Sequence, residues 1–289
     1  MGKTKILIFS ILLALDLVIA GSLWIGDAFG SGKLELHVLD VGQGDAVLLR
    51  TPEMHNVLID GGPGNEVLMG MAASMPYLFS EIDLLVLTHP HADHIEGLIP
   101  VLDRFEVGAV MLSAPEYGNL AYKHFLDEIA AGSANGDFQV FFADDGTDFR
   151  LGSVTLDVLY PFEPIVGEEM ENVNNASPVI LVHCETCGGG SDGASVLLAG
   201  DAEREIEAAL LEAGALDGVD VDVFKSSHHG SRTANSLEFL EAIAPEMMVI
   251  SLGEGNSFDH PHDETLENAE ELGIEIRRTD LEGQVTIEF

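Results

Sequence analysis

Short apolar runs recur along the chain and are separated by glycine-rich turns or by amphipathic segments. Two runs, "LELHVLDVG" at 34–42 and "DAVLLRT" at 45–51, have the length of β-strands and flank the Gly42–Gly44 turn, which predicts paired strands. A third run, "NVLIDGG" at 56–62, is a further strand that ends in an aspartate and two glycines. Beyond it, apolar strands alternate with helical patterns, of which "AEREIEAALLEAG" at 202–214 is the clearest.

The remaining elements continue this alternation to the end of the chain. The predicted helices cover residues 65–80, 95–105, 120–131, 202–214, 235–244 and 263–273. The predicted strands cover residues 82–88, 107–112, 138–143, 154–160, 178–185, 194–201, 221–227, 246–253, 274–279 and 284–289. Each half of the chain thus starts with neighbouring strands and ends with strand–helix alternation. Mixed sheets packed face to face, with helices on both outer faces, satisfy this pattern and predict an α/β fold.

The first 32 residues differ from the rest. Ile6–Ile25 is a run of twenty residues with a single charge, Asp16, and its length matches the apolar core of a bilayer. The charge would cost roughly 2.5–3.5 kcal/mol at the centre of a span, which the leucines and isoleucines can offset. Lysines precede the run and acidic residues follow it, so we expect the N-terminus inside and the rest outside the cytoplasm.

We therefore divide the chain into a membrane anchor with a tether, residues 1–32, and one domain, residues 33–289. Gly26–Gly32 reads as a short flexible tether, and no further linker follows it. A cleaved signal peptide is the alternative, because Val18–Ala20 resembles a small-residue cleavage site. In that case the domain would be secreted. Either interpretation predicts that the domain lies outside the cytoplasm.

Acidic residues outnumber basic ones by 50 to 12, which gives a formal net charge of −38. A field of this sign keeps a protein soluble and repels polyanions at long range. DNA binding usually needs Lys and Arg to neutralise phosphates, yet the chain has no basic stripe, and Arg277 and Arg278 are its only adjacent basic pair. The composition therefore argues against DNA binding through a basic surface. It also fits adaptation to a salty medium, in which the field is screened within a few ångströms.

The two cysteines, Cys184 and Cys187, stand in "HCETCGGG" at a predicted hairpin tip. In an exported protein such a pair can close a small disulfide loop. It can also be half of a zinc site, but the chain has no second pair. We expect a structural or incidental role.

Three histidines and one carboxylate follow the apolar strand at 82–88 within six positions. They are His89, His91, Asp93 and His94. Neutral imidazole and carboxylate are ligands for zinc and for harder ions such as manganese. In an extended loop, His89 and His91 point the same way and can hold one ion. Where the loop turns into a helix, Asp93 and His94 can face a second ion.

Four ligands cannot complete two metal sites, and further His and Asp residues follow other apolar strands. Asp201 ends "LLAGD", and a carboxylate there can bridge two ions about 3.5–4 Å apart. His228 and His229 follow "FKSS", while His260 and His262 follow the strand "MMVISLG". These residues are spread over 170 positions, so only a fold can bring them together.

The HxHxDH motif after an apolar strand resembles the metallo-β-lactamase superfamily, whose fold is a four-layered αβ/βα sandwich. Other segments narrow the resemblance: "VLDVGQGDAVLL", "LIDGG", "LTHPHADHIEGL", "NNASPVILV", "LLAGDAE", "FKSSHHGS", "NSFDHPH" and "RRTDLEGQVTI". They occur in the order seen in the C-terminal hydrolase domain of ComEC-type competence (DNA-uptake) proteins. The resemblance covers residues 34–289.

The resemblance implies a site for two divalent ions, zinc or manganese. His89 and His91 would hold the first ion, Asp201 would bridge, and the second ion would be held by Asp93, His94 and His229. The superfamily's usual third histidine of the first site is not evident. Asn174–Ser177 occupies that stretch, and His183 is a poor substitute because it lies in mid-strand.

The remaining candidates concern the substrate. Lys225, His228 and His260 could bind a phosphate oxygen or protonate the leaving group, next to the catalytic ligand Asp93. Asn174, Asn175 and Ser177 offer donors to a non-bridging oxygen. Asp60, which we group with these substrate-side residues, could orient a metal ligand or be only a turn residue.

Three functions fit these residues. The first is a metal-dependent phosphodiesterase or nuclease that acts, by resemblance, on single-stranded DNA or another phosphodiester. The second, which the acidic surface permits more easily, is hydrolysis of small or surface-linked esters: phosphorylcholine esters, lactones or thioesters. The third is a non-catalytic metal-binding subunit docked to a separate DNA-uptake channel. ComEC proteins have a multi-helix channel domain, whereas this chain has at most one span and cannot itself form a channel.

Overall fold

The structure, a computed structural model, describes residues 32–75, 81–188 and 193–289. Within these ranges, no helix has both the length and the hydropathy that a membrane span requires. The predicted span at Ile6–Ile25 lies outside the described residues, so the anchor stays a prediction.

The first sheet has seven strands and is built mainly from the N-terminal half of the chain. In spatial order these are β14 (Val285–Glu288), β1 (Glu35–Val38), β2 (Val47–Arg50), β3 (Asn56–Ile59), β4 (Glu81–Leu87), β5 (Glu106–Leu112) and β6 (Gln139–Phe142). The pairs from β14 to β3 are antiparallel, and those from β3 to β6 are parallel. The last strand of the chain thus completes the sheet that the first strand begins.

The second sheet has the same plan. Its strands, in spatial order, are β13 (Glu275–Arg278), β12 (Met247–Ile250), β11 (Val223–Lys225), β10 (Ala194–Leu198), β9 (Val179–Cys184), β8 (Val154–Tyr160) and β7 (Phe149–Leu151). The pairs from β7 to β10 are antiparallel, and those from β10 to β13 are parallel. The predicted hairpin of β9 and β10 is therefore present.

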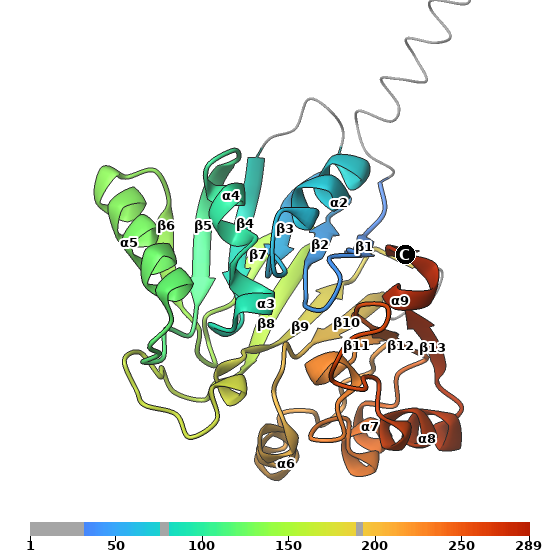
Figure 1. Cartoon of the computed structure of the whole chain (residues 1–289). Coiled ribbons are helices and arrows are strands. Elements are labelled where there is room, and N and C mark those ends of the chain that lie inside the picture. Colours follow the sequence, from blue (N-terminus) through green and yellow to red (C-terminus); the bar gives the residue numbers. More distant parts are fainter. Residues whose placement is uncertain (1–31, 76–80, 189–192) are drawn as a thin grey trace, which may run out of the picture.

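Helices cover the outer face of each sheet (Figure 1). On the first sheet these are α2 (Glu66–Ser74), α3 (Ala92–Ile95), α4 (Leu98–Leu102) and α5 (Leu120–Asn135). On the second they are α6 (Arg204–Ala213), α7 (Leu237–Ile243) and α8 (Asp263–Leu272). The short α9 (Thr279–Glu282) and the 3₁₀ turns η1 (Val173–Ala176) and η2 (Ser227–Gly230) complete the fold.

Three apolar cores separate these four layers. The middle core lies between the sheets and contains residues from both, such as Val86 of β4 and Val182 of β9. The other two lie between each sheet and its helices, and contain for example Phe125 of α5 and Phe239 of α7. Strands buried on both faces read as continuous apolar runs, which explains sequences such as "IDLLVL". The predicted four-layered αβ/βα sandwich is confirmed.

Three predicted helices have clearly different bounds, and the one predicted over 120–131 continues to Asn135. Instead of one helix over 95–105, the chain forms α3 and α4 with a break at Glu96 and Gly97. The break lets the chain pass close to the loop after β3, where the Gly97 nitrogen donates to the Gly62 carbonyl at 2.9 Å. The helix predicted over 65–80 ends at Ser74, where Met75 is extended, and residues 76–80 lie outside the described ranges. The short strand β7 was not predicted.

Cys184 and Cys187 form a disulfide at the end of β9. Of the two interpretations of this pair, the structure therefore supports the disulfide loop rather than half of a zinc site. Both residues are buried in the core between the sheets, which favours the structural role.

The close passage at Gly97 gives a test of the packing beside the candidate site. A Cβ atom at this position would lie 1.8 Å from the Gly61 carbonyl oxygen, although the Gly97 backbone has helical angles that alanine adopts readily. We expect Gly97→Ala to lower the free energy of unfolding by about 1–3 kcal/mol, measured by urea denaturation.

Gly118→Ala is the matched control, because nothing lies within 4 Å of a Cβ there. If both variants unfold at the same urea concentration as the parent protein, the described approach of the two loops is wrong.

Candidate metal centre

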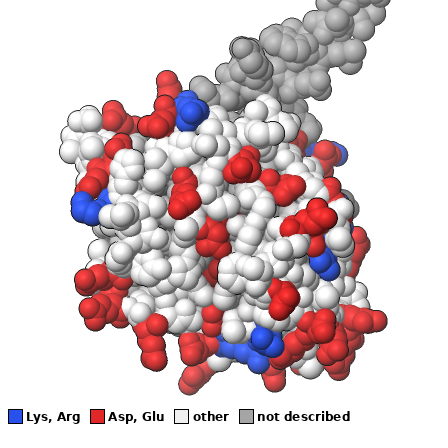
Figure 2. Space-filling view, viewed as in Figure 1, with Lys and Arg blue, Asp and Glu red and all other residues white. Residues whose placement is uncertain are grey.

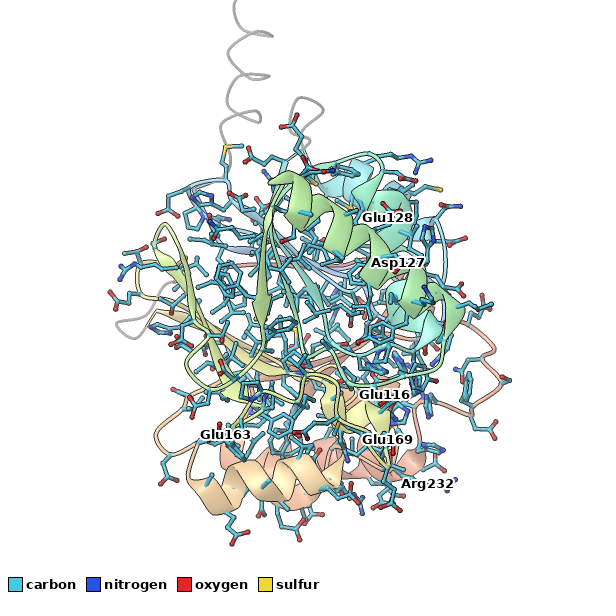
Figure 3. All side chains as sticks on the ribbon, turned by 90° about the vertical axis from the view of Figure 1, so that its left-hand side faces the viewer. Glu116, Asp127, Glu128, Glu163, Glu169 and Arg232 are labelled. Atoms are coloured by element: carbon cyan, nitrogen blue, oxygen red, sulfur yellow. A yellow bond between two sulfur atoms is a disulfide. The ribbon has the colours of Figure 1, made fainter. Side chains whose placement is uncertain are left out.

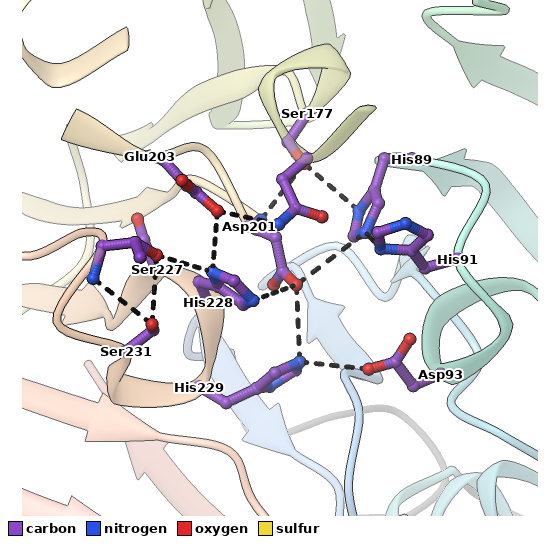
Figure 4. A network of polar contacts seen from close by, with 12 residues as sticks. His89, His91, Asp93, Ser177, Asp201, Glu203, Ser227, His228, His229 and Ser231 are labelled. Atoms are coloured by element: carbon purple, nitrogen blue, oxygen red, sulfur yellow. Dashed lines mark hydrogen bonds and ion pairs between the residues drawn. The ribbon is translucent and has the colours of Figure 1, made fainter. Parts of the chain in front are cut away.

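The candidate site lies where the carboxyl ends of strands from both sheets meet. His89 follows β4, Asp201 follows β10, and His229 follows β11. Parallel strands place their carboxyl ends at one edge of a sheet, which is where α/β proteins bind ligands. Figure 4 shows Asp201 between His89 and His91 on one side and His228 on the other, with Asp93 and His229 below.

The Asp201 carboxylate is the centre of the cluster. Its Oδ2 atom lies 3.3 Å from Nε2 of His94 and 3.5 Å from Nε2 of His229. It also lies 3.8 Å from Nε2 of His89 and 3.9 Å from Nε2 of His228. The backbone nitrogen of Asp201 donates to the hydroxyl of Ser177 at 3.1 Å, which fixes the position of this residue.

The His94 ring is held from behind by Asp60. The Asp60 Oδ2 atom lies 2.7 Å from Nδ1 of His94, and the carboxylate also accepts hydrogen bonds from the nitrogen and hydroxyl of Thr88. A proton on Nδ1 therefore leaves Nε2 free to face the cluster. Asp60 is buried, so its predicted role of orienting a ligand fits the geometry, whereas direct contact with a substrate does not.

The His229 ring is held in the same way. Its Nδ1 lies 3.0 Å from the Ser251 carbonyl oxygen and 3.2 Å from Oδ1 of Asp45, so Nε2 faces Asp201. His228 and His229 both have positive φ, 48° and 54°. The Asn235 side chain stabilises this tight loop by accepting from the Ser227 nitrogen and donating to the carbonyls of Ser227 and Ser231.

The first predicted metal position is less complete. His89 Nε2 and His91 Nδ1 lie 3.0 Å apart, which brings both nitrogens to one place but is shorter than the spacing of two donors on one tetrahedral ion. Behind His89, the hydroxyls of Thr88 and Ser177 lie 3.2 and 3.3 Å from Nδ1. Among the described residues, no third histidine joins this pair in the way that His229 joins Asp93 and His94 at the other position.

The donors fit a divalent cation. Nε2 of His94, Nε2 of His229 and Oδ1 of Asp201 are buried and have no hydrogen-bond partner. Buried polar atoms are almost always hydrogen-bonded, so three such atoms in one place require another partner. Two donors about 2.0–2.2 Å from one tetrahedral ion lie about 3.3–3.6 Å apart, and the 3.3 and 3.5 Å spacings around Asp201 have this value.

The electrostatics of the metal-free cluster agree with this assignment. Burial disfavours a charged His229 ring, but the carboxylates of Asp201 and Asp45 outweigh it and raise its pKa to about 9. Burial also disfavours a charged His94 ring, but the carboxylates of Asp201 and Asp60 outweigh burial and raise the His94 pKa. The pKa of Asp201 is held well below its ordinary value, against burial, by the nearby imidazoles. The cluster thus favours positive charge at these ring nitrogens, where a cation would be bound.

Lys225 does not have its predicted role in substrate binding. Its side chain is 2% exposed and pairs with the Asp45 carboxylate, 180 residues earlier in the chain. Burial alone would raise the pKa of Asp45, but the Lys225 and His229 charges lower it to about 2. Because Asp45 also contacts His229, Lys225 supports a metal ligand from behind and cannot reach a phosphate.

The predicted substrate-side donors are also engaged inside the protein. Asn174 donates to Glu203 at 2.9 Å, and Asn175 accepts from the Glu203 nitrogen at 2.9 Å. Ser177 is fully buried and holds both Asp201 and His89. We correct these three roles from substrate contact to support of the site. The prediction of substrate contact rested on position alone, because "NNAS" occupies the stretch in which the superfamily usually has a metal ligand.

His228 and His260 lie at the rim, where a substrate can reach them. The His228 side chain is 22% exposed, and its Nδ1 lies 3.2 Å from Oε1 of Glu203. His260 is half-buried, and burial together with the His229 and His228 charges lowers its pKa to about 4. His262 stands behind it, with ring centroids 4.9 Å apart.

Two supporting carboxylates were missed from the sequence, those of Asp45 and Glu203. The signal for Asp45 was present in "VGQGD", where glycines precede a carboxylate between two strands. A Cβ atom at Gly44 would lie 2.2 Å from the Asp93 carbonyl oxygen, so only glycine allows this loop to approach the metal loop. The Asp45 nitrogen then donates to the same carbonyl at 3.1 Å.

Comparison with known proteins agrees with the fold and the donor set. The family model described as "Metallo-beta-lactamase superfamily" matches residues 39–254. The chain belongs to the metallo-β-lactamase superfamily. Its donors and this membership together identify a metal-dependent hydrolase.

The resemblance to ComEC-type competence proteins is also confirmed. The chain is 25% identical to ComE operon protein 3 of Bacillus subtilis over 281 residues, which cover 90% of this chain and 33% of the relative. It is 29% identical to competence protein ComA of Neisseria gonorrhoeae over 261 residues, covering 89% and 32%. The chain thus spans about a third of the length of these relatives.

A solved structure supports the fold alone. CmlA, a diiron β-hydroxylase from Streptomyces venezuelae, superposes with a TM-score of 0.57 at 19% identity, covering 89% of this chain and 54% of CmlA.

The buried Asp45–Lys225 pair can be tested by a double-mutant cycle. Lys225→Met leaves the Asp45 carboxylate buried without its partner, which typically costs about 3–5 kcal/mol. Asp45→Asn combined with Lys225→Met removes both charges and should recover most of that loss. The free energy of unfolding of the metal-free protein, from urea denaturation, measures both effects. Wild-type stability of Lys225→Met, with turnover alone impaired, would instead restore its predicted role at the substrate.

The raised histidine pKa values predict proton release on metal binding. His229 keeps its proton up to a pKa of about 9, above the ordinary 6.5, and His94 is raised in the same direction. Each proton must leave before its nitrogen binds a cation. We expect zinc affinity to rise with pH between about 6.5 and 9, and calorimetric heats to depend on the buffer's ionisation enthalpy.

The same shifts set the stability of the metal-free protein. The stabilisation from these protons is present below pH 6.5 and is lost as the pH rises through about 9. Heats that are identical in buffers of different ionisation enthalpy would show that the two rings are neutral before metal binds.

Proposed function

We propose that this protein is a dinuclear metal-dependent phosphodiesterase that cleaves DNA, with single-stranded DNA as its substrate. The observation that carries the proposal is the full set of donors, His89, His91, Asp93, His94, Asp201 and His229, in a chain whose curated relatives include a protein named as a competence protein. Those relatives are about three times longer, so their names support the proposal and do not transfer an activity.

The donors form two groups, one for each of two ions of zinc or manganese. His89 and His91 would hold one, Asp93, His94 and His229 would hold the other, and Asp201 lies within reach of both groups. Two divalent ions at such a site supply positive charge for the phosphoryl oxygens and lower the pKa of a water nucleophile. Asp60 and Asp45 fix the rings of His94 and His229, so these donors are oriented before binding.

His228 is the residue best placed to act on the leaving group. Its ring lies at the rim, 3.9 Å from Asp201, and Glu203 contacts the opposite nitrogen. A histidine held in this way can bind a phosphate oxygen and donate a proton to the leaving oxygen. His260 has a lowered pKa of about 4 and is neutral at pH 7, so it suits hydrogen bonding to the substrate better than proton donation.

The acidic surface favours a second candidate, hydrolysis of small esters. Figure 2 shows acidic side chains spread over one whole face and only a few basic ones. Glu116 and Glu169, labelled in Figure 3, are exposed, and their backbones pair in an isolated bridge. Such a surface repels a polyanion. A third candidate, a non-catalytic subunit, lacks a supporting observation, because the donor set is intact.

Asp93 is the residue whose loss tests the proposal most simply. Asp93→Asn should lower kcat/KM on single-stranded DNA and on bis-p-nitrophenyl phosphate at least about a hundredfold, because a ligand of the second ion loses its charge. Asp103→Asn, an exposed carboxylate at the end of α4, is the control for the charge change and should keep full activity.

The full chain, loaded with zinc or manganese, is assayed at low and high salt, with a lactone in parallel. DNA cleavage that persists in both the Asp93→Asn variant and the His94→Ala variant would contradict the dinuclear mechanism. Turnover of the lactone with no cleavage of either phosphodiester would favour the second candidate.

A further inference from the structure

A continuous row of ring contacts runs through the metal centre. The rings of His91, His89, His94, His229 and His260 follow one another with centroids 4.2–6.2 Å apart. Each end of the row contacts an aromatic ring that is not a metal donor. Tyr117 meets His91 at 5.6 Å, edge to face, and Phe258 stacks on His260 at 5.7 Å.

The two terminal rings are exposed to solvent. Tyr117 is 37% exposed and lies in the loop between β5 and α5, and Phe258 is 59% exposed and lies in the loop between β12 and α8. These loops belong to different halves of the sandwich. Scattered exposed apolar residues need no explanation, but these two rings contact the two ends of one row of rings that includes the metal donors.

The charges of the described residues indicate which kind of contact can provide affinity for a substrate. Seven of the ten lysines and arginines in residues 32–289 form ion pairs with carboxylates: Lys33, Arg50, Lys123, Arg204, Lys225, Arg277 and Arg278. Little positive charge is therefore available to neutralise phosphates, which is the usual source of affinity for DNA. Apart from the charge that bound ions would supply at the scissile phosphate, a strand bound here would gain most of its affinity from uncharged contacts.

We propose that Tyr117 and Phe258 are the substrate-binding platforms of this site and stack on nucleobases on either side of the scissile phosphate. The inference rests on the proposed phosphodiesterase function and specifies the contacts that would hold the single-stranded substrate. Every base has an aromatic face, so stacking binds a strand without regard to sequence. Bases inside a duplex are already stacked on one another, so duplex DNA cannot use the platforms.

The experiment compares three substrates in the zinc- or manganese-loaded full chain. They are a single-stranded oligonucleotide, its duplex, and an abasic strand of the same length. The variants are Tyr117→Ala, Phe258→Ala and both together. Phe142→Ala is the matched control, because Phe142 is 45% exposed but lies on the edge strand β6. Tyr117→Phe and Phe258→Tyr retain a ring and test rescue.

We expect each alanine variant to raise KM for the single strand about tenfold, from the loss of one stacked base, with kcat nearly unchanged. The abasic strand should show a high KM in the parent protein and no further change in the variants. The ring-retaining variants and Phe142→Ala should match the parent. The salt slope of log Kd for the catalytically inactive Asp93→Asn protein should be shallow, with a magnitude of about 1 or less.

Several results would overturn the platforms while leaving the phosphodiesterase intact. These are an unchanged KM in the double variant, an equal loss on the abasic strand, or an equal loss in Phe142→Ala. A steep salt slope would show that phosphate neutralisation provides the affinity after all. By contrast, a parent protein that cleaves none of the phosphodiesters would refute the proposed function itself.

Discussion

The structure depends on one buried carboxylate, that of Asp201, which is surrounded by imidazoles at the meeting point of both sheets. Its Oδ2 atom has four histidine nitrogens within 4 Å, and the cluster leaves buried donor atoms without hydrogen bonds. Such a group is costly in an apolar interior unless positive charge compensates it. The raised pKa values of His94 and His229 place positive charge on these rings when no ion is bound, and divalent ions would supply it in the enzyme that we propose. The fold, the loop geometry and the supporting carboxylates can all be understood as means of holding this cluster.

Much of this could be predicted from the sequence because its signals are local. The HxHxDH motif lies within six residues, and apolar runs that end in His or Asp identify strand ends, so the α/β sandwich and the donor residues could be predicted.

Contacts between distant segments could not be predicted from the sequence. Lys225 looked like a phosphate-binding residue because no rule on sequence spacing indicates Asp45, 180 residues away, as its partner. Asn174 and Asn175 were misread for the same reason, since Glu203 accepts from one and donates its backbone nitrogen to the other. The break at Gly97 likewise depends on the backbone of Gly61. The N-terminal anchor stays a prediction.

The acidic surface and a polyanionic substrate are compatible only if affinity and catalysis have different sources. Divalent ions held by these donors would supply positive charge at the scissile phosphate and so lower the barrier. Aromatic rings at the ends of the donor row can hold bases without opposing the net charge of −38. A basic groove would bind DNA of any form, whereas the proposed arrangement would select flexible single strands. High salt, which weakens proteins that rely on phosphate neutralisation, would then have little effect on binding.

The central claim is that this cluster holds two ions bridged by Asp201. Crystals of the full chain grown with zinc or manganese, measured above and below the absorption edge of the metal, test it directly. The account predicts two anomalous peaks about 3.5–4 Å apart on either side of the Asp201 carboxylate, one beside His89 and His91 and the other beside Asp93, His94 and His229. A single peak, or none within reach of Asp201, would contradict it.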